Sequence, residues 1–269
     1  MGHYPKKHDV GPFVASQLRS GDPYELSHGH PIRCAPTGGS GSGPNAIGAS
    51  VVGWDPAVKE VGVDTGYSPE PGTLRAPDVA VGNVPDRPGW VQGAPQLAIE
   101  YADIGQDENT LQEKIADLLA AGTQVIWVVR LTGRRRVEVH RPGQAVQTML
   151  PGEHLTAPGI LKNPVLVEAL YDRNAAERTT LTNLLQRAGY EDLEAVLNEG
   201  RKEGQKEGRE EGRLTQARAA LRRVLEKRKL AVSPDLVARI EGCDDLARLD
   251  DWHDRAIDAA TLADVFGAD

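Results

Sequence analysis

Residues 77–127 read PDVAVGNVPDRPGWVQGAPQLAIEYADIGQDENTLQEKIADLLAAGTQVIW. Two segments of this stretch predict β-strands, one over residues 77–81 and one over 96–102, because apolar residues favoured in strands alternate in them with smaller ones. Side chains alternate between the two faces of a strand, so Asp78 and Glu100 each lie on a face whose other members are alanines. If the strands are adjacent, the two carboxylates can bind a hard cation such as Mg²⁺, which takes oxygen ligands.

The segment from Asp107 to Gly122 predicts an amphipathic helix. Its leucines and isoleucine recur at helical spacing, Asp107 can cap the first turn, and Gly122 suits the position after the last one. On a helical wheel Lys114 lies about 60° from Leu111, at the edge of the apolar stripe. Its ammonium group can therefore extend along the sheet surface to the carboxylates. Two carboxylates and a lysine are the parts of a metal-dependent phosphodiesterase site.

The apolar run over residues 125–129 follows the helix and predicts a strand that is covered on both faces. At these residues the chain resembles the Uma-two family of restriction endonucleases, within the PD-(D/E)XK nuclease superfamily. The superfamily pattern has an aspartate on one strand and Glu-x-Lys on the next. Asp78 and Glu100 match that pattern, whereas Ala102 stands where the lysine would be. The Uma-two pattern moves the lysine onto the following helix, and Lys114 stands at that offset.

The resemblance spans most of residues 20–165 and implies a restriction-endonuclease-like α/β fold, in which helices flank a mixed sheet. The function it implies is that of a metal-dependent DNA endonuclease that hydrolyses phosphodiester bonds. Asp78 and Glu100 would hold Mg²⁺ or Mn²⁺, and Lys114 would orient the nucleophile or stabilise developing charge. Glu25 is a candidate additional metal ligand, because related nucleases sometimes add an N-terminal acid to the metal site.

This chain departs from the commoner family pattern at two places. Asp103-Ile104 follows the glutamate strand where the family has Ser-Pro, and Leu118 lies one turn after the lysine where the family has a tyrosine. Both departures fall close to the predicted site.

Three consecutive arginines, Arg134, Arg135 and Arg136, precede an alternating segment over residues 137–140 that predicts a half-exposed strand. They form the densest group of phosphate-binding side chains in the predicted nuclease domain and are candidates for contacts with the DNA backbone. A turn of solvated charges is an equally good interpretation.

The composition is that of a globular protein, with 39% hydrophobic and 26% charged residues among 269. No apolar run approaches the length of a membrane span, and residues 1–9 contain no hydrophobic signal region. Cys34 and Cys243 are far apart, which indicates neither a disulfide framework nor a zinc site. We therefore expect a cytoplasmic protein without a membrane partner.

The chain becomes helical in character after Asn163, which predicts a nuclease domain over residues 1–165, a helical arm over 166–230 and a small acidic helical tail over 231–269. The arm contains a four-residue repeat whose members are Glu199-Gly200, Glu203-Gly204, Glu207-Gly208 and Glu211-Gly212. On a helix these glycines form one slowly drifting stripe, and a second helix could approach it closely. This favours a homo-oligomer formed through the C-terminal helices. A partly mobile charged spacer is the alternative, because glycine costs about 1 kcal/mol relative to alanine in a helix.

Charge is unevenly distributed at this end of the chain. Residues 200–230 carry a net charge of +6, and residues 231–269 carry −7. The two blocks can attract each other, or they can form a solvated helix followed by an acidic segment.

Two other classes of function are alternatives to the nuclease. A nuclease-fold scaffold without turnover, acting through its C-terminal helices, is the main alternative, since a fold does not determine a function. A small-molecule enzyme lacks support, because the chain has no nucleophile elbow or dinucleotide fingerprint. The glycine- and serine-rich segment over residues 37–45 lacks the ending of a phosphate-binding loop, and we expect it to be a flexible loop.

Overall fold

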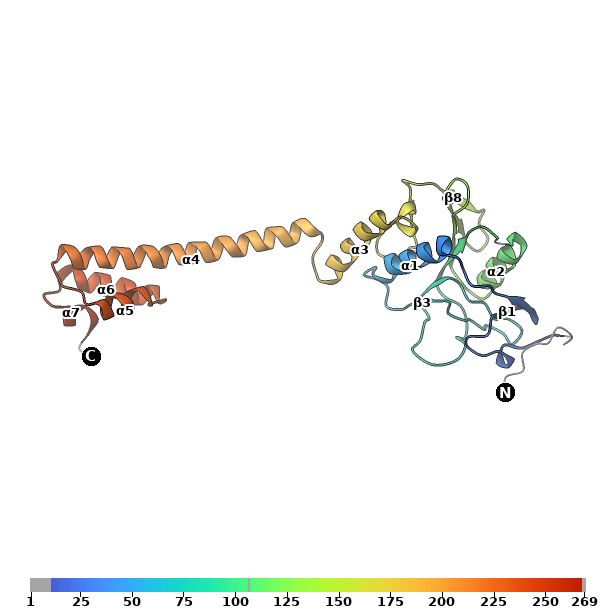
Figure 1. Ribbon diagram of the computed structural model, residues 1–269, viewed down its shortest axis with the longest axis horizontal. Helices are drawn as coiled ribbons and strands as arrows, with labels where there is room; N and C mark the ends of the chain where they lie inside the picture. Colours follow the sequence, from blue (N-terminus) through green and yellow to red (C-terminus); the bar gives the residue numbers. More distant parts are fainter. Residues whose placement is uncertain (1–10, 106, 268–269) are drawn as a thin grey trace. The chain divides into compact units, whose positions relative to one another are not determined.

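The computed structural model describes residues 11–105 and 107–267 of the chain. These residues form two compact units, the first ending at Asp192 and the second beginning at Leu193 (Figure 1). Each unit has its own hydrophobic core. Among the described residues, no helix combines the length and the apolar composition that a bilayer span requires.

A six-stranded sheet forms the centre of the first unit. The strands lie in the order β3-β4-β5-β6-β7-β8, and β5 and β6 are parallel whereas the other neighbours are antiparallel. This mixed sheet confirms the predicted α/β class. The strands are β3 (Val61–Val63), β4 (Val79–Val81), β5 (Leu97–Ala102), β6 (Val125–Arg130), β7 (Arg136–His140) and β8 (Gln147–Met149).

Helix α2 (Glu108–Ala120) provides the crossover between the parallel strands and covers one face of the sheet. It begins where predicted, because the Asp107 side chain accepts a hydrogen bond from the Thr110 N–H, and Gly122 follows it in a left-handed conformation at φ 111°. Its leucines and isoleucine pack on the alanine face of β5, in a cluster formed by Ala98, Ala102, Leu111, Ile115, Leu118, Ile126 and Val128. The alternation read from the strand therefore determines which face receives the helix.

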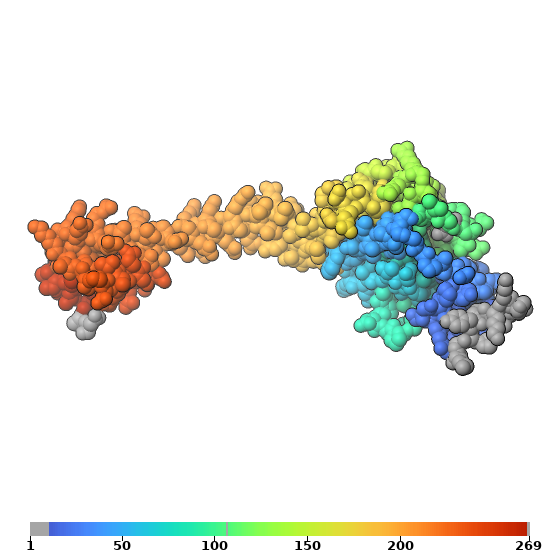
Figure 2. All heavy atoms as spheres, viewed as in Figure 1, coloured from blue at the N-terminus to red at the C-terminus, as the bar shows by residue number. Residues whose placement is uncertain are grey.

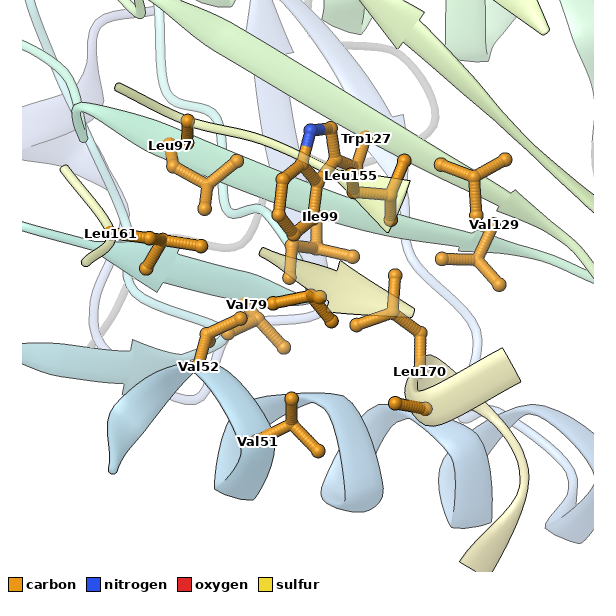
Figure 3. Close-up of a cluster of buried hydrophobic side chains, with 14 of the residues drawn as sticks. Val51, Val52, Val79, Leu97, Ile99, Trp127, Val129, Leu155, Leu161 and Leu170 are labelled. Carbon is orange, nitrogen blue, oxygen red and sulfur yellow. The ribbon is translucent and has the colours of Figure 1, made fainter. Parts of the chain in front are cut away.

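Helix α1 (Gly39–Gly53) covers the opposite face together with a 3₁₀ turn, η2 (Val167–Leu170). Figure 3 shows Val51 and Val52 of α1 beneath Val79, Ile99 and Trp127 of the sheet. The first turns of α1 are the glycine- and serine-rich segment, so the expectation of a flexible loop there was wrong. Packing of the buried valines outweighs the poor helix propensity of the glycines.

Short elements complete the first unit. A hairpin turn at His28 and Gly29 has positive φ at both residues, as a two-residue loop of type I′ requires. The elements are η1 (Ala15–Gln17), β1 (Tyr24–Ser27) paired with β2 (His30–Arg33), and β9 (His154–Leu155) paired with β10 (Val165–Leu166).

Helix α3 (Arg173–Arg187) belongs to the first unit, which therefore extends beyond the boundary predicted at residue 165. The buried Asn183 amide donates to the Val51 carbonyl of α1. The Arg187 guanidinium donates to the carbonyls of Trp54, Asp55 and Val58 just after α1. These long-range bonds attach α3 to α1, and they could not be read from the helical pattern alone.

The second unit joins the part of the predicted arm that begins at Leu193 and the predicted tail in one helical bundle. Its helices are α4 (Leu193–Lys227), α5 (Pro234–Glu241), α6 (Leu246–Asp258) and α7 (Leu262–Phe266). The last turns of α4 pack against the other helices in a core that contains Leu221, Leu225, Ile240, Leu249, Trp252, Ala256 and Val265. The basic and acidic blocks meet here, since Arg218 and Arg222 lie 2.8 Å from Asp244 and Glu241, respectively.

Candidate active site

The antiparallel register of β4 and β5 brings the two predicted carboxylates together. Val79 pairs with Ile99, so the next step of the register places Asp78 opposite Glu100. The Asp78 Oδ2 atom accepts a hydrogen bond of 2.6 Å from the backbone N–H of Tyr101. Asp78 is thus fixed on the backbone of the strand that carries Glu100.

Lys114 reaches the same place from α2. Its Nζ atom lies 3.0 Å from Glu100 Oε1 and donates to Glu100 Oε2 at 3.1 Å and to the Ala76 carbonyl at 2.7 Å. Ala102, which is 4% exposed, packs under α2 on the same face of β5 as Glu100. The ammonium group therefore approaches Glu100 from the helix, while position 102 of the strand contributes only a methyl group.

Glu25 joins the cluster from β1. Its Oε1 atom lies 3.2 Å from the Lys114 Nζ atom, and its Oε2 atom accepts from Arg75 at 3.3 Å. Both oxygens therefore face a cation of this chain. The structure brings Asp78, Glu100, Lys114 and Glu25 into one neighbourhood.

Sequence reasoning missed three further residues around Lys114. The Arg75 guanidinium is buried and binds Asp117, whose Oδ2 atom also accepts from the Ser27 hydroxyl at 2.9 Å. Asp117 could have been found, because it lies three residues after Lys114 and so on the same side of the helix. Arg75 carried no such signal, since it lies in an irregular segment with no repeating pattern.

Burial and neighbouring charges shift the pKa values of the ionisable side chains in the cluster. The pKa of Glu100 is raised to about 8: burial contributes most, Lys114 opposes the increase, and the carboxylates of Asp78 and Glu25 add to it. Burial also raises the pKa of Asp78. Burial alone would lower the pKa of Lys114, but Glu100, Glu25 and Asp78 together raise it. The Lys114 ammonium therefore keeps its proton.

Asp64 is another acid that the sequence did not single out. Burial raises the pKa of its carboxyl group, which also senses the charges of Lys114 and Glu25. Its backbone N–H lies against the Asp78 carbonyl at 3.4 Å. Acidic side chains thus surround Lys114 on several sides, which favours the approach of a further cation.

The donor set fits a hard metal ion. Mg²⁺ binds proteins through one or two carboxylates and keeps several water molecules, and Asp78 and Glu100 supply two carboxylates. The Glu100 Oε1 atom is buried and has no hydrogen-bond partner, although it lies 3.0 Å from Lys114 Nζ, so it has a lone pair available for a cation. Across residues 11–105 and 107–267, no three or more His, Cys, Asp or Glu side chains are grouped so that together they could hold a metal ion.

The three predicted phosphate-binding arginines do not form one cluster. Arg136 lies 2.9 Å from Glu138, and the Arg135 guanidinium stacks on the Tyr171 ring at 4.8 Å from its centre. Arg134 is exposed in the loop after β6. Because β5 and β6 are parallel, the loop after β6 lies at the same end of the sheet as the last residue of β5, Ala102, which is two residues after Glu100.

Comparisons with known proteins agree with this architecture. A family model, Uma2, described as "Putative restriction endonuclease", matches residues 13–166. A solved structure from Anabaena variabilis, described as a "putative nuclease belonging to DUF820", superposes with a TM-score of 0.52 at 18% sequence identity. The superposition covers 61% of this chain and 99% of that one, and at this identity it shows a shared fold. A search of curated proteins found no match.

Proposed function

Because the chain belongs to the Uma2 family of restriction endonucleases, we propose that it is a metal-dependent endonuclease that hydrolyses phosphodiester bonds in DNA. The observation that carries the proposal is the position of the Lys114 ammonium, 3.0 Å from Glu100 and beside the strand position of Asp78. An aspartate, a glutamate and a lysine in this arrangement supply the charges that phosphodiester hydrolysis needs.

Asp78 and Glu100 would hold Mg²⁺ or Mn²⁺ in this proposal. When bound, the ion lowers the pKa of a coordinated water and polarises the phosphate. Asp78 keeps its place by accepting from the Tyr101 N–H, and Glu100 keeps its place through Lys114. Glu25 is the candidate third acidic ligand, and it would have to release Lys114 or Arg75 to serve as one.

Lys114 provides the positive charge near the reacting phosphate. Its raised pKa keeps it cationic, so it can orient the attacking water or stabilise charge that develops on the phosphate oxygens. Of the three arginines, Arg134 is exposed in the loop after β6 and is the one best placed to contact the DNA backbone, whereas the Arg135 guanidinium stacks on the Tyr171 ring. Arg136 is already engaged by Glu138 and contributes less to this role.

We further infer that two copies associate in parallel through α4. The helix is exposed from residue 197 to residue 213 (Figure 2), and the glycines at 200, 204, 208 and 212 have nothing within 4 Å of an added Cβ. At about 100° per residue, the glutamates lie on one side of the glycine stripe and the arginines on the other. In a parallel pair related by a two-fold axis, each glutamate side faces an arginine side, whereas an antiparallel pair would bring like charges together.

The two cysteines are free, as the reducing cytoplasm proposed for this protein would keep them. The competing function is that of a scaffold, which keeps the nuclease fold and does not cut DNA. The following experiment separates the two.

Cleavage of supercoiled plasmid with added Mg²⁺ or Mn²⁺ tests the proposal. We expect the parent protein to nick or linearise the plasmid and EDTA to stop it. Asp78→Asn and Glu100→Gln should each remove cleavage without unfolding the protein, because they remove ligand charge at nearly constant volume. Glu138→Gln, the same change on β7, two strands away from Glu100, serves as the control and should leave cleavage unchanged. Cleavage that survives in both site variants would exclude this site, and a folded parent without cleavage would favour the scaffold.

A further inference from the structure

Arg75 is a charged side chain in the interior of the first unit. It is 1% exposed and is among the largest fully buried side chains of the described chain. Its backbone N–H donates to the Tyr67 carbonyl at 2.9 Å, and its carbonyl accepts from the Tyr67 N–H at 2.8 Å. A buried charge is retained only where partners compensate for its lost hydration, so its partners indicate what it does.

The partners of Arg75 lie on two different elements. Its Nε and Nη2 atoms lie 2.8 and 2.7 Å from the Asp117 Oδ2 atom, on α2. Its Nη1 atom lies 3.3 Å from the Glu25 Oε2 atom, on β1. The planar guanidinium thus holds two carboxylates at once, which a lysine ammonium cannot do with the same geometry.

Glu25 links Arg75 to Lys114, because its two carboxylate oxygens contact one of these cations each. The second Glu25 oxygen lies 3.2 Å from the Lys114 Nζ atom, which in turn contacts Glu100. Charges therefore alternate along a continuous path from Asp117 through Arg75, Glu25 and Lys114 to Glu100. Lys114 has a flexible four-carbon stem, so its acceptors determine where the ammonium lies.

We propose that Arg75 is a positioning residue, which holds Glu25 so that the Lys114 ammonium stays beside Glu100. The proposal rests on the nuclease function argued above, because it assigns Arg75 to the placement of the proposed catalytic lysine. Arg75 itself contacts Asp117 and Glu25, and it acts on Lys114 only through Glu25.

Arg75→Lys separates positioning from simple stability. Lysine keeps the buried positive charge but lacks the fork that binds both carboxylates. If Arg75 only stabilises the fold, a folded Arg75→Lys variant should cut DNA like the parent. If Arg75 positions Lys114, kcat should fall about a hundredfold while KM for DNA stays unchanged, since a small misplacement of a catalytic group can cost that much.

Arg187→Lys is the matched control. Arg187 also donates its guanidinium to several acceptors, the carbonyls of Trp54, Asp55 and Val58, and none of these belongs to the cluster around Lys114. The same substitution there should leave kcat unchanged. Circular dichroism of both variants establishes that they are folded.

A second readout does not depend on cleavage. Reductive methylation of the metal-free protein, followed by peptide mass spectrometry, measures how fast each lysine reacts. Lys114 is 12% exposed and paired, so it should react more slowly than the exposed Lys59. In Arg75→Lys its rate should rise several-fold, whereas the rate of Lys59 should not change.

These outcomes decide the proposal. Parent-like kcat and parent-like labelling of Lys114 in folded Arg75→Lys would overturn it, and so would a variant in which only KM rises. If Arg75→Lys does not fold, Asp117→Asn replaces it, because it loosens Arg75 at constant volume and should produce the same two changes. If the parent does not cut DNA, the nuclease proposal fails, and the labelling of Lys114 still decides whether Arg75 holds it.

Discussion

At the scale of single residues, Lys114 and Ala102 together explain how the site is assembled. Ala102 shares the buried face of β5 with Glu100, and α2 covers that face. A lysine at position 102 would extend from the strand toward the same carboxylate that Lys114 contacts from the helix. Position 102 and position 114 are thus two alternative sources for one ammonium group.

This leads to a rescue prediction. Lys114→Ala should lose most of the cleavage rate and keep metal affinity, because an ammonium group is not a metal ligand. Adding Ala102→Lys to that variant should recover part of the rate, since catalytic groups tolerate errors of only about 0.5 Å. Plasmid cleavage and metal titration measure the two properties. Lys59→Ala, at an exposed lysine, is the control, and a Lys114→Ala variant that cuts like the parent would remove Lys114 from the site.

The buried carboxylate of Asp55 is predicted to stabilise the first unit. Its carboxylate is 1% exposed and accepts from the backbone N–H groups of Ala57, Lys162 and Asn163 at 2.9, 2.8 and 2.9 Å. Asp55→Ala would leave these donors without a partner, at a cost of about 1–3 kcal/mol each. We expect the free energy of unfolding in urea to fall by about 3 kcal/mol or more. Asp86→Ala, at an exposed position, should change it little; an equally small change for Asp55→Ala would refute this account.

At the scale of elements, α4 consists of two different halves. Its last turns contribute Leu221 and Leu225 to the core of the second unit. Its residues 197–213 are exposed on every side. A helix that is polar all round is stable in isolation only with compensation, and the proposed parallel pairing of two copies supplies it.

The prediction for α4 is a change in solution mass. Gly204→Leu combined with Gly208→Leu should lower the mass measured by sedimentation equilibrium, because leucine side chains would block the close approach of two backbones. Lys202→Leu with Lys206→Leu places the same side chains on the opposite side of the helix and should leave the mass unchanged. An unaltered mass together with increased helicity in the glycine variant would support the spacer instead, since leucine is the better helix former.

At the scale of the whole molecule, the chain is divided at residues 192 and 193 into units with separate cores. The first unit contains the sheet, α1 to α3 and every residue of the candidate site. The second contains the charge blocks, which meet through Arg218 and Arg222. Each of these pairs has an exposed carboxylate and contributes little energy, so the apolar core stabilises the bundle.

Fragments should therefore fold separately. We expect residues 1–192 and residues 193–269, each expressed alone, to give the helicity of the corresponding part of the intact chain and cooperative thermal transitions. Circular dichroism measures both properties. A first fragment that does not fold without the second would show that the two cores depend on each other.

The sequence by itself determined those helices and strands that a short-range pattern of apolar residues encodes. Alternation in β4 and β5 identified the faces that carry Asp78 and Glu100, and helical spacing identified α2 and the side of it that carries Lys114. The structure brings these three residues together. The physical reason is that strand and helix periods fix side-chain directions within a few residues. The pairing of strands then needed only the family resemblance and the pattern of apolar residues.

Only the tertiary structure decided the remaining features. The glycine-rich start of α1 is helical because Val51 and Val52 pack beneath the sheet, and α3 joins the first unit through long-range hydrogen bonds. Arg75 can be buried because Glu25 and Asp117, distant from it in the chain, supply its compensating charges. The cost of burying a charge depends on partners that folding alone brings near, and no local pattern encodes them.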